Sequence, residues 1–125
     1  MSGYLLDTHV LIWLQKEPQR IADSVLHLLG DADVSVNVSS ASLWEIDIKR
    51  SQKKLSIEAP GELLRHFGFR ELHVTSRYTS TAAQLPLHHK DPFDRMLIAQ
   101  AQVESLILVT SDKQMLPYDV PIISV

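Results

Sequence analysis

Four acidic residues that are far apart in this sequence, Asp7, Glu45, Asp94 and Asp112, are the side chains most able to do chemistry together. Hard cations such as Mg²⁺ prefer oxygen ligands, are held by a few carboxylates plus water, and complete their shell with substrate phosphate oxygens. Such an ion activates a water molecule and neutralises charge during phosphodiester cleavage. If the four carboxylates meet in the fold, they could form a metal-dependent nuclease site.

Other catalytic patterns are missing from the sequence. It has no Ser-His-Asp arrangement, no phosphate-binding P-loop and no His-Glu-x-x-His motif, and His88 and His89 are adjacent rather than spaced as transition-metal ligands. With no cysteine, the chain has neither disulfides nor a thiolate zinc site. Metal-assisted hydrolysis therefore has no competitor among the motifs.

The four carboxylates must be positioned by the elements around them. Asp7 ends the apolar run 4–6 and Asp112 comes shortly after the apolar run 106–109, and both runs are typical of buried strands. Glu45 lies about two turns into a predicted helix, and Asp94 lies in the first turn of another. In open parallel sheets, ligands bind outside the carboxyl ends of the strands, so Asp7 and Asp112 satisfy this geometric test directly.

Hydrophobic periodicity predicts strands that alternate with helices. The expected strands cover residues 4–6, 34–38, 71–74, 106–109 and 120–125, and the expected helices cover 10–14, 18–29, 41–52, 60–67, 76–85 and 92–104. Continuous apolar strands separated by helices indicate an α/β fold with a mainly parallel sheet covered on both faces. The 125 residues, without repeat or linker, are expected to form a single domain, 1–125.

Each of the four carboxylates also has an ordinary structural explanation. Asp7 and Asp112 could cap the turns that follow them, and the segment from Asp91 to Asp94 has the arrangement of a helix N-terminus with proline at its first position. Glu45 could pair with Lys49 one turn later on an exposed helix face. From the residues alone, both readings remain open.

Overall charge does not exclude a nucleic acid. The net charge is −3, from 12 basic and 15 acidic residues, but four metal-binding carboxylates would leave the other charges nearly balanced. No apolar run is long enough to cross a membrane, and the first residues have no basic segment typical of a signal peptide. We therefore expect a cytoplasmic protein with no membrane contact.

Four ordered motifs resemble those of the PIN-domain nucleases, and more closely the VapC-type toxins of bacterial toxin–antitoxin pairs. They are Leu-Leu-Asp-Thr-His at 5–9, Ser-Leu-Trp-Glu-Ile-Asp-Ile-Lys at 42–49, Leu-Pro-Leu-His-His-Lys-Asp-Pro-Phe-Asp-Arg at 85–95, and Val-Thr-Ser-Asp at 109–112. The resemblance covers essentially the whole chain, and the third motif is the most specific.

The resemblance implies a three-layer α/β/α fold and endoribonuclease activity with Mg²⁺ or Mn²⁺. It also implies a homodimer and inhibition by a cognate VapB-like antitoxin. The site residues that it assigns, by position in this sequence, are the acidic quartet Asp7, Glu45, Asp94 and Asp112, with Thr110, Thr8 and Lys49 in supporting or substrate-contacting roles. Arg95 is expected to be structural and Asp91 a cap, while Asp47 stands where a small apolar residue is common.

Two rival functions remain at this point. The first is a non-catalytic binding module that keeps the fold and uses its acidic residues as caps. The second is a nuclease acting on DNA or on a nucleic-acid structure, which would share the metal chemistry. The sequence does not determine the target RNA, its cleavage sequence or the number of metal ions.

Overall fold

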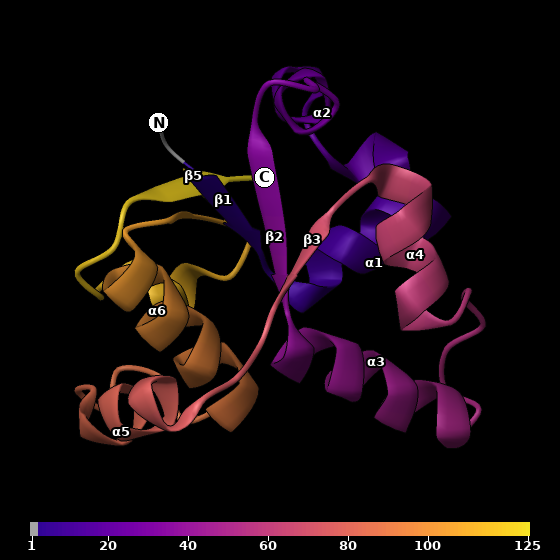
Figure 1. Ribbon diagram of the computed structural model, residues 1–125. Coiled ribbons are helices and arrows are strands. Elements are labelled where there is room, and N and C mark those ends of the chain that lie inside the picture. The colour runs from indigo at the N-terminus through magenta and orange to yellow at the C-terminus, as the bar shows by residue number, and fades with distance from the viewer. Residues whose placement is uncertain (1–2) are drawn as a thin grey trace.

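A parallel five-stranded sheet forms the centre of the computed structural model, which describes residues 3–125 (Figure 1). Its strands are β1 (Gly3–Leu6), β2 (Ser35–Ser39), β3 (Arg70–Leu72), β4 (Ile107–Thr110) and β5 (Ile122–Ser124). Their order in the sheet is β3-β2-β1-β4-β5, so the strand order reverses at β1. The predicted parallel sheet is confirmed, and Asp7 follows the strand at the switch point where ligands bind in such sheets.

Helices cover both faces of the sheet. Leu6, Val38 and Val109 face α1 (Thr8–Lys16), α2 (Asp23–Leu29), α3 (Ser40–Ser51) and α4 (Pro60–Phe67). Leu5 and Leu108 face the opposite side, where they pack with α5 (Ser76–Gln84) and α6 (Pro92–Glu104). Neighbouring strand residues thus alternate between two cores, as the pleat requires. The predicted three-layer α/β/α sandwich is confirmed.

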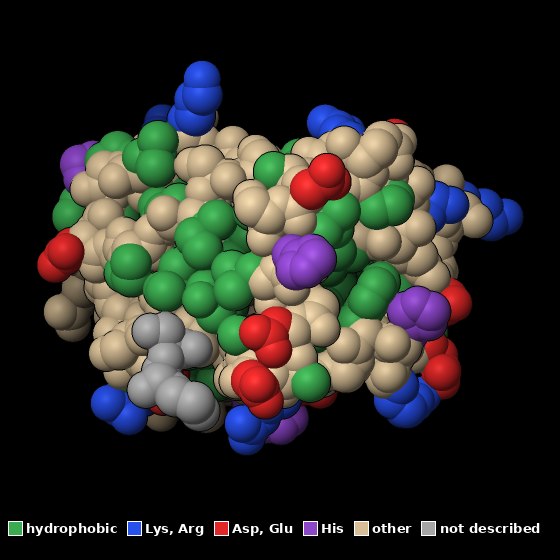
Figure 2. Space-filling view, turned by 90° about the horizontal axis from the view of Figure 1, so that it is seen from above, with side chains coloured by type: hydrophobic (Ala, Val, Ile, Leu, Met, Phe, Trp, Pro, Cys, Tyr) green, Lys and Arg blue, Asp and Glu red, His purple; other side chains and the backbone are tan. Residues whose placement is uncertain are grey.

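The two ends of the strands differ in chemical character. Figure 2 looks onto the edge near the amino ends of the strands, where hydrophobic side chains gather near the centre and lysines and arginines lie toward the rim. Asp7 and Asp112 follow the carboxyl ends of β1 and β4, at the other edge. Among the described residues, no helix has both the length and the apolar character needed to span a bilayer.

One predicted helix is wrong. The segment 18–29 divides into a single 3-10 turn, Pro18–Arg20, and α2, which begins at Asp23. Between them Ile21 is extended, with φ −105° and ψ 133°, and its side chain is buried in the core. The guanidinium of Arg20 lies over the ring of Trp13, 4.1 Å from its centroid. Burial of Ile21 therefore requires a break in a segment whose periodicity favours one helix.

Strand lengths also differ from expectation, mainly in β3 and β5, the two outermost strands of the sheet. Residues 73–74 lie outside β3, which begins at Arg70, and residues 120–121 and 125 lie outside β5, so that each of these strands has three residues. Each of these strands is bordered by a partner on one side only, so fewer hydrogen bonds hold its ends. The helix Pro60–Phe67, by contrast, has the predicted limits.

Arg95, on the first turns of α6, fixes the loop that joins α5 to α6. Its guanidinium donates to four backbone oxygens, those of Ala82 at 2.8 Å, Leu85 at 2.9 Å, Pro86 at 3.0 Å and His89 at 3.2 Å. A planar guanidinium suits this task because its several N–H groups have fixed directions. The predicted structural role of Arg95 thereby has a geometric basis.

We expect Arg95→Lys to lower the free energy of unfolding by about 2 kcal/mol, because a lysine cannot replace all four hydrogen bonds and leaves backbone oxygens without donors. Chemical denaturation measures the change. Arg77→Lys, an exposed substitution on α5, is the matched control and should change stability by less than about 0.5 kcal/mol. Equal stabilities of the two variants would contradict the assignment.

Candidate metal centre

Asp7 is fixed at the carboxyl end of β1 by the neighbouring strand β4. Parallel pairing sets Leu6 beside Val109, so the next residues along both strands meet at the sheet edge. There Thr110 Oγ1 donates to Asp7 Oδ2 at 2.6 Å, and the backbone N–H of Asp112 donates to Thr110 Oγ1 at 3.0 Å. Thr110 therefore links Asp7 to the chain that carries Asp112.

The side chain of Asp7 does not cap α1. Asp7 occupies the N-cap position, but its carboxylate accepts no capping hydrogen bond, and only 2% of the residue is exposed. Within residues 3–125, its Oδ1 is buried without any hydrogen-bond partner. Burial raises the pKa of the carboxyl, an effect that the Thr110 hydrogen bond and His9 oppose and that Asp112 increases. A buried carboxylate oxygen without a donor is suited to a cation.

Asp94 and Asp112 converge on His89, a residue that the sequence reasoning did not select. His89 Nε2 forms a hydrogen bond with Asp112 Oδ2 at 2.9 Å and lies 2.8 Å from Asp94 Oδ2. The histidine comes from the loop between α5 and α6 and is 8% exposed. These three side chains have potential ligand atoms close enough to share one ion. Its adjacency to His88 concealed this role, because tertiary contacts decide which ring points inward.

Two capping predictions hold for neighbouring aspartates. Asp91 Oδ1 accepts from the Phe93 N–H at 2.8 Å, so Asp91 is the N-cap of α6, as expected. Asp112 Oδ1 accepts from the Gln114 N–H at 2.9 Å and caps the turn Lys113–Met115. Asp112 can therefore cap this turn and contact His89 at the same time, because its other oxygen, Oδ2, faces His89.

The electrostatic environment of Asp94 disfavours its charged form. Burial raises its pKa to about 7, from 3.8, and the nearby Asp7 and Asp91 carboxylates add to the increase. His89 acts in the opposite direction, and Asp112 raises the pKa further. Negative groups that repel one another in a half-buried position are expected where a cation binds.

Glu45 lies on α3 and, within residues 3–125, forms no hydrogen bond with the other three acidic residues. Its Oε2 is 3.6 Å from Lys49 Nζ, so the alternative ion pair is present. The pair is not on a fully exposed face, since the Glu45 side chain is only 15% exposed and Oε1 is buried without a partner in the described chain. Glu45 therefore shares with Asp7 a buried oxygen that lacks a donor.

Thr8, the neighbour of Asp7 in the sequence, contacts α3 through its side chain. Its Oγ1 donates to Ser42 Oγ at 2.9 Å, a buried hydrogen bond between the start of α1 and the first turn of α3. Ser42 precedes Glu45 by three residues, so this bond fixes α3 relative to the end of β1. Next to Glu45, the ring of Trp44 contacts Phe93, the neighbour of Asp94, with centroids 5.3 Å apart. The first contact joins α3 to α1 next to Asp7, and the second joins α3 to α6 next to Asp94.

The residues present fit a hard divalent cation. Two buried carboxylate oxygens, Asp7 Oδ1 and Glu45 Oε1, lack donors in the described part of the chain, and Asp94 is a carboxyl whose charge needs compensation. Oxygen-rich ligand sets of this kind are typical of Mg²⁺ and Mn²⁺ sites. The carboxyl edge of the sheet is therefore a candidate metal centre.

Comparisons with known proteins agree with this fold. The family described as PIN domain matches residues 4–120. Ribonuclease VapC22 of Mycobacterium tuberculosis is 30% identical over 121 residues, which cover 92% of this chain and 91% of that protein. The family match extends over the elements that carry all four acidic residues.

Solved structures share the fold at lower sequence identity. VapBC2 from Rickettsia felis, bound to a DNA fragment from its promoter, contains a chain with TM-score 0.70 and 19% identity, with 97% of each chain covered. FitAcB from Neisseria gonorrhoeae gives a TM-score of 0.68 at 20% identity, with 97% of this chain and 96% of that chain covered. The resemblance predicted from the motifs is confirmed, and the chain belongs to the PIN-domain family, with VapC-type proteins among its relatives.

Proposed function

We propose that this protein is a metal-dependent endoribonuclease of the VapC type, neutralised by a cognate antitoxin. The single observation that carries the proposal is the convergence of Asp7, Asp94 and Asp112 at the carboxyl edge of the sheet, with a buried Asp7 oxygen that lacks a donor in the described chain. Its relative VapC22 is a ribonuclease. RNA is therefore the substrate to test first.

Asp7, Glu45, Asp94 and Asp112 are the proposed ligands of Mg²⁺ or Mn²⁺ and the proposed catalytic carboxylates. When bound, such an ion activates water and neutralises phosphate charge. Thr110 holds the Asp7 carboxylate through its 2.6 Å hydrogen bond. Lys49 restrains Glu45 and places a positive charge beside the acidic edge, where it can contact phosphate.

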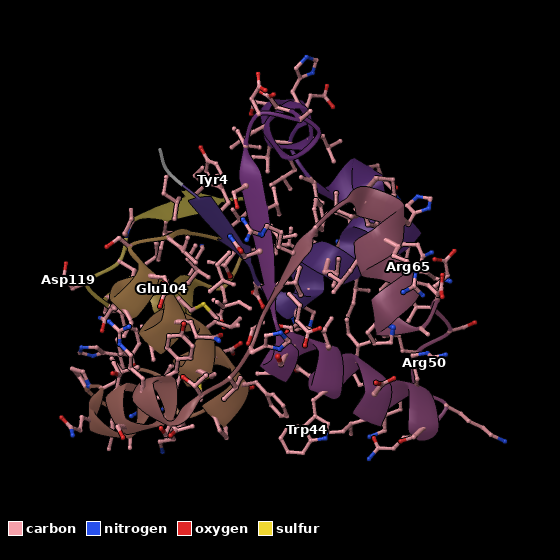
Figure 3. All side chains as sticks on the ribbon, viewed as in Figure 1. Tyr4, Trp44, Arg50, Arg65, Glu104 and Asp119 are labelled. Atoms are coloured by element: carbon pink, nitrogen blue, oxygen red, sulfur yellow. The ribbon has the colours of Figure 1, made fainter. Side chains whose placement is uncertain are left out.

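Two protein partners belong to the same proposal. Solved structures that share this fold include a toxin–antitoxin complex from Klebsiella pneumoniae and a member of the VapBC family of toxin–antitoxin systems, and we propose a VapB-like partner here. We also propose a homodimer formed through an apolar surface around Trp44, which is 64% exposed and projects from α3 (Figure 3). Val74, Phe93 and Met96 line the same apolar hollow. An exposed tryptophan beside such a hollow is typical of a protein interface.

We expect Asp7→Asn and Asp94→Asn to reduce cleavage of single-stranded RNA by at least about 100-fold, because each removes a negative charge needed to hold the ion. The measurement uses matched RNA and DNA oligomers with Mg²⁺ or Mn²⁺, and with EDTA. Water as the nucleophile leaves 5′-phosphate ends on the RNA products. The cognate antitoxin should suppress the activity.

Asp47→Asn is the matched control for these variants. Asp47 lies on the same helix as Glu45 but is exposed and paired with Arg50 at 3.0 Å, so its loss should leave cleavage within about twofold. Products with 2′,3′-cyclic phosphate would overturn the proposed chemistry. Preferred cleavage of the DNA oligomer would favour a DNA nuclease, and activity unchanged in both Asn variants would favour the non-catalytic module.

In the metal-free protein, ionisation of Asp94 should lower the free energy of unfolding as pH rises from about 4 to about 7. Because the folded-state pKa of Asp94 is raised to about 7 from 3.8, the folded state binds more protons than the unfolded state between these values. We therefore expect Asp94→Asn to be more stable than the wild type by about 1 to 3 kcal/mol near pH 8, and by little near pH 4. Thermal melting in EDTA measures the difference.

Adding Mn²⁺ at pH 8 supplies the internal control for this prediction. The ion should raise the melting temperature of the wild type, because binding to the folded state alone stabilises it, and should raise that of Asp94→Asn much less. A pH-independent difference between the two proteins in EDTA would show that Asp94 does not carry the expected electrostatic cost.

We expect Trp44→Ser to convert the proposed dimer into a monomer, because removing the indole takes away the largest exposed apolar group of the hollow. Light scattering coupled to size exclusion measures the mass. Leu116→Ser, which alters another exposed apolar residue outside this hollow, is the control and should leave the dimer intact. A wild type that is monomeric at about 100 µM, well above the dissociation constants of stable complexes, would refute the dimer.

A further inference from the structure

His89 occupies the point where Asp94 and Asp112 approach each other. Its Nε2 lies 2.8 Å from one carboxylate oxygen and 2.9 Å from the other. Seen alone, this arrangement has one nitrogen and two oxygen ligand atoms around a possible ion. The role of the ring depends on whether Nε2 carries a proton or offers a lone pair.

The hydrogen bond at the other ring nitrogen, Nδ1, determines which nitrogen carries the proton. The backbone N–H of Asp91 donates to His89 Nδ1 at 3.3 Å, so Nδ1 must present its lone pair. A neutral imidazole has one N–H, which is then on Nε2. Histidines that bind metals usually have the opposite arrangement, in which the second nitrogen donates to a carbonyl or a carboxylate. The Asp91 amide therefore makes Nε2 a hydrogen-bond donor.

The ring is held in this orientation by contacts that do not involve the carboxylates. Tyr118 Oη accepts from the His89 backbone N–H at 2.9 Å and itself donates to the Pro86 oxygen at 2.6 Å. Arg95 donates to the His89 backbone oxygen at 3.2 Å. With the residue 8% exposed, its side chain has little space to rotate away.

A donor at this position determines which carboxylate oxygens are free for an ion. Each oxygen of Asp112 accepts one hydrogen bond, Oδ2 from His89 and Oδ1 from the Gln114 N–H, and each keeps a second lone pair for an ion. Asp7 is engaged at Oδ2 by Thr110 and keeps Oδ1. Asp94 Oδ1 has no hydrogen bond or ion pair within residues 3–125, and Glu45 Oε1 is likewise without a donor.

We propose that His89 is a positioning residue of the metal centre and not a metal ligand. Its Nε2–H holds Asp112 and keeps Asp94 beside it, so that the ion is bound by oxygen atoms alone. This inference rests on the proposed metal site and goes beyond it by naming the residue that arranges the ligands. An all-oxygen set is the ligand type that suits Mg²⁺ and Mn²⁺, whereas an imidazole ligand would suit Ni²⁺ and Zn²⁺ better.

The tautomer can be measured without metal. Nitrogen-15 NMR of the histidine rings in the metal-free protein at pH 8 should show a proton on His89 Nε2, with the His89 signals assigned by their loss in His89→Gln. A bare Nε2 with the proton on Nδ1 would overturn the proposal. This result does not depend on the nuclease function, because it requires neither RNA nor an ion.

Metal binding supplies the second measurement. We expect His89→Gln, whose amide can donate from a similar position, to bind Mn²⁺ within about threefold of the wild type, and His89→Leu to bind about 10- to 100-fold more weakly. The control His88→Ala alters the exposed neighbour in the same loop and should bind like the wild type. Calorimetry in the absence of substrate gives the three affinities.

If His89 is a metal ligand, the Mn²⁺ affinities of the variants should differ from those expected above. If Nε2 were a ligand, His89→Gln would bind Mn²⁺ as weakly as His89→Leu, and pulsed EPR of Mn²⁺ in the wild type would show coupling to a histidine nitrogen; either result overturns the proposal. A wild type that binds neither Mn²⁺ nor Mg²⁺ would instead refute the proposed metal-dependent function. The tautomer measurement would then still test the arrangement of His89.

Discussion

Asp7 is held at the end of β1 by a short hydrogen bond from Thr110, and this contact requires β1 and β4 to be parallel neighbours in register. The same threonine accepts the backbone N–H of Asp112, so one hydroxyl sets the relation between two acidic residues that are far apart in sequence. At Asp7, the pairing of β1 with β4 therefore has both a structural and an electrostatic effect. It buries an acidic group that water can no longer stabilise, and a cation is the natural compensation.

The second determinant is the loop between α5 and α6. Arg95 binds four of its backbone oxygens or those just before it, and Tyr118 holds two of its residues. These contacts bring His89 inward although it is in a segment without regular secondary structure. A loop fixed by several charge-assisted hydrogen bonds can position a side chain as firmly as a helix does. Arg95 therefore supports the acidic edge through this loop, without contacting the acidic residues themselves.

Membership of the PIN-domain family agrees with this physical picture, since a fold with converging acidic residues at the carboxyl edge suits metal-assisted hydrolysis. The four acidic residues are nevertheless not equivalent. Asp7 is buried with an oxygen that has no donor in the described chain, Asp112 is a cap as well as a partner of His89, and burial raises the pKa of Asp94 to about 7. Glu45 lies on a separate helix, α3, which the Thr8–Ser42 hydrogen bond joins to the start of α1.

The sequence by itself determined the order of strands and helices, the α/β class and the positions of Asp7 and Asp112 at strand ends, because hydrophobic periodicity and strand length are local properties. The four ordered motifs also indicated the resemblance to the PIN-domain family. Tertiary structure alone decided that His89 rather than His88 turns inward, that Thr8 contacts Ser42, and that a single helix cannot cover 18–29. These outcomes depend on which distant groups compete for one buried space, and no local spacing in the sequence encodes that competition.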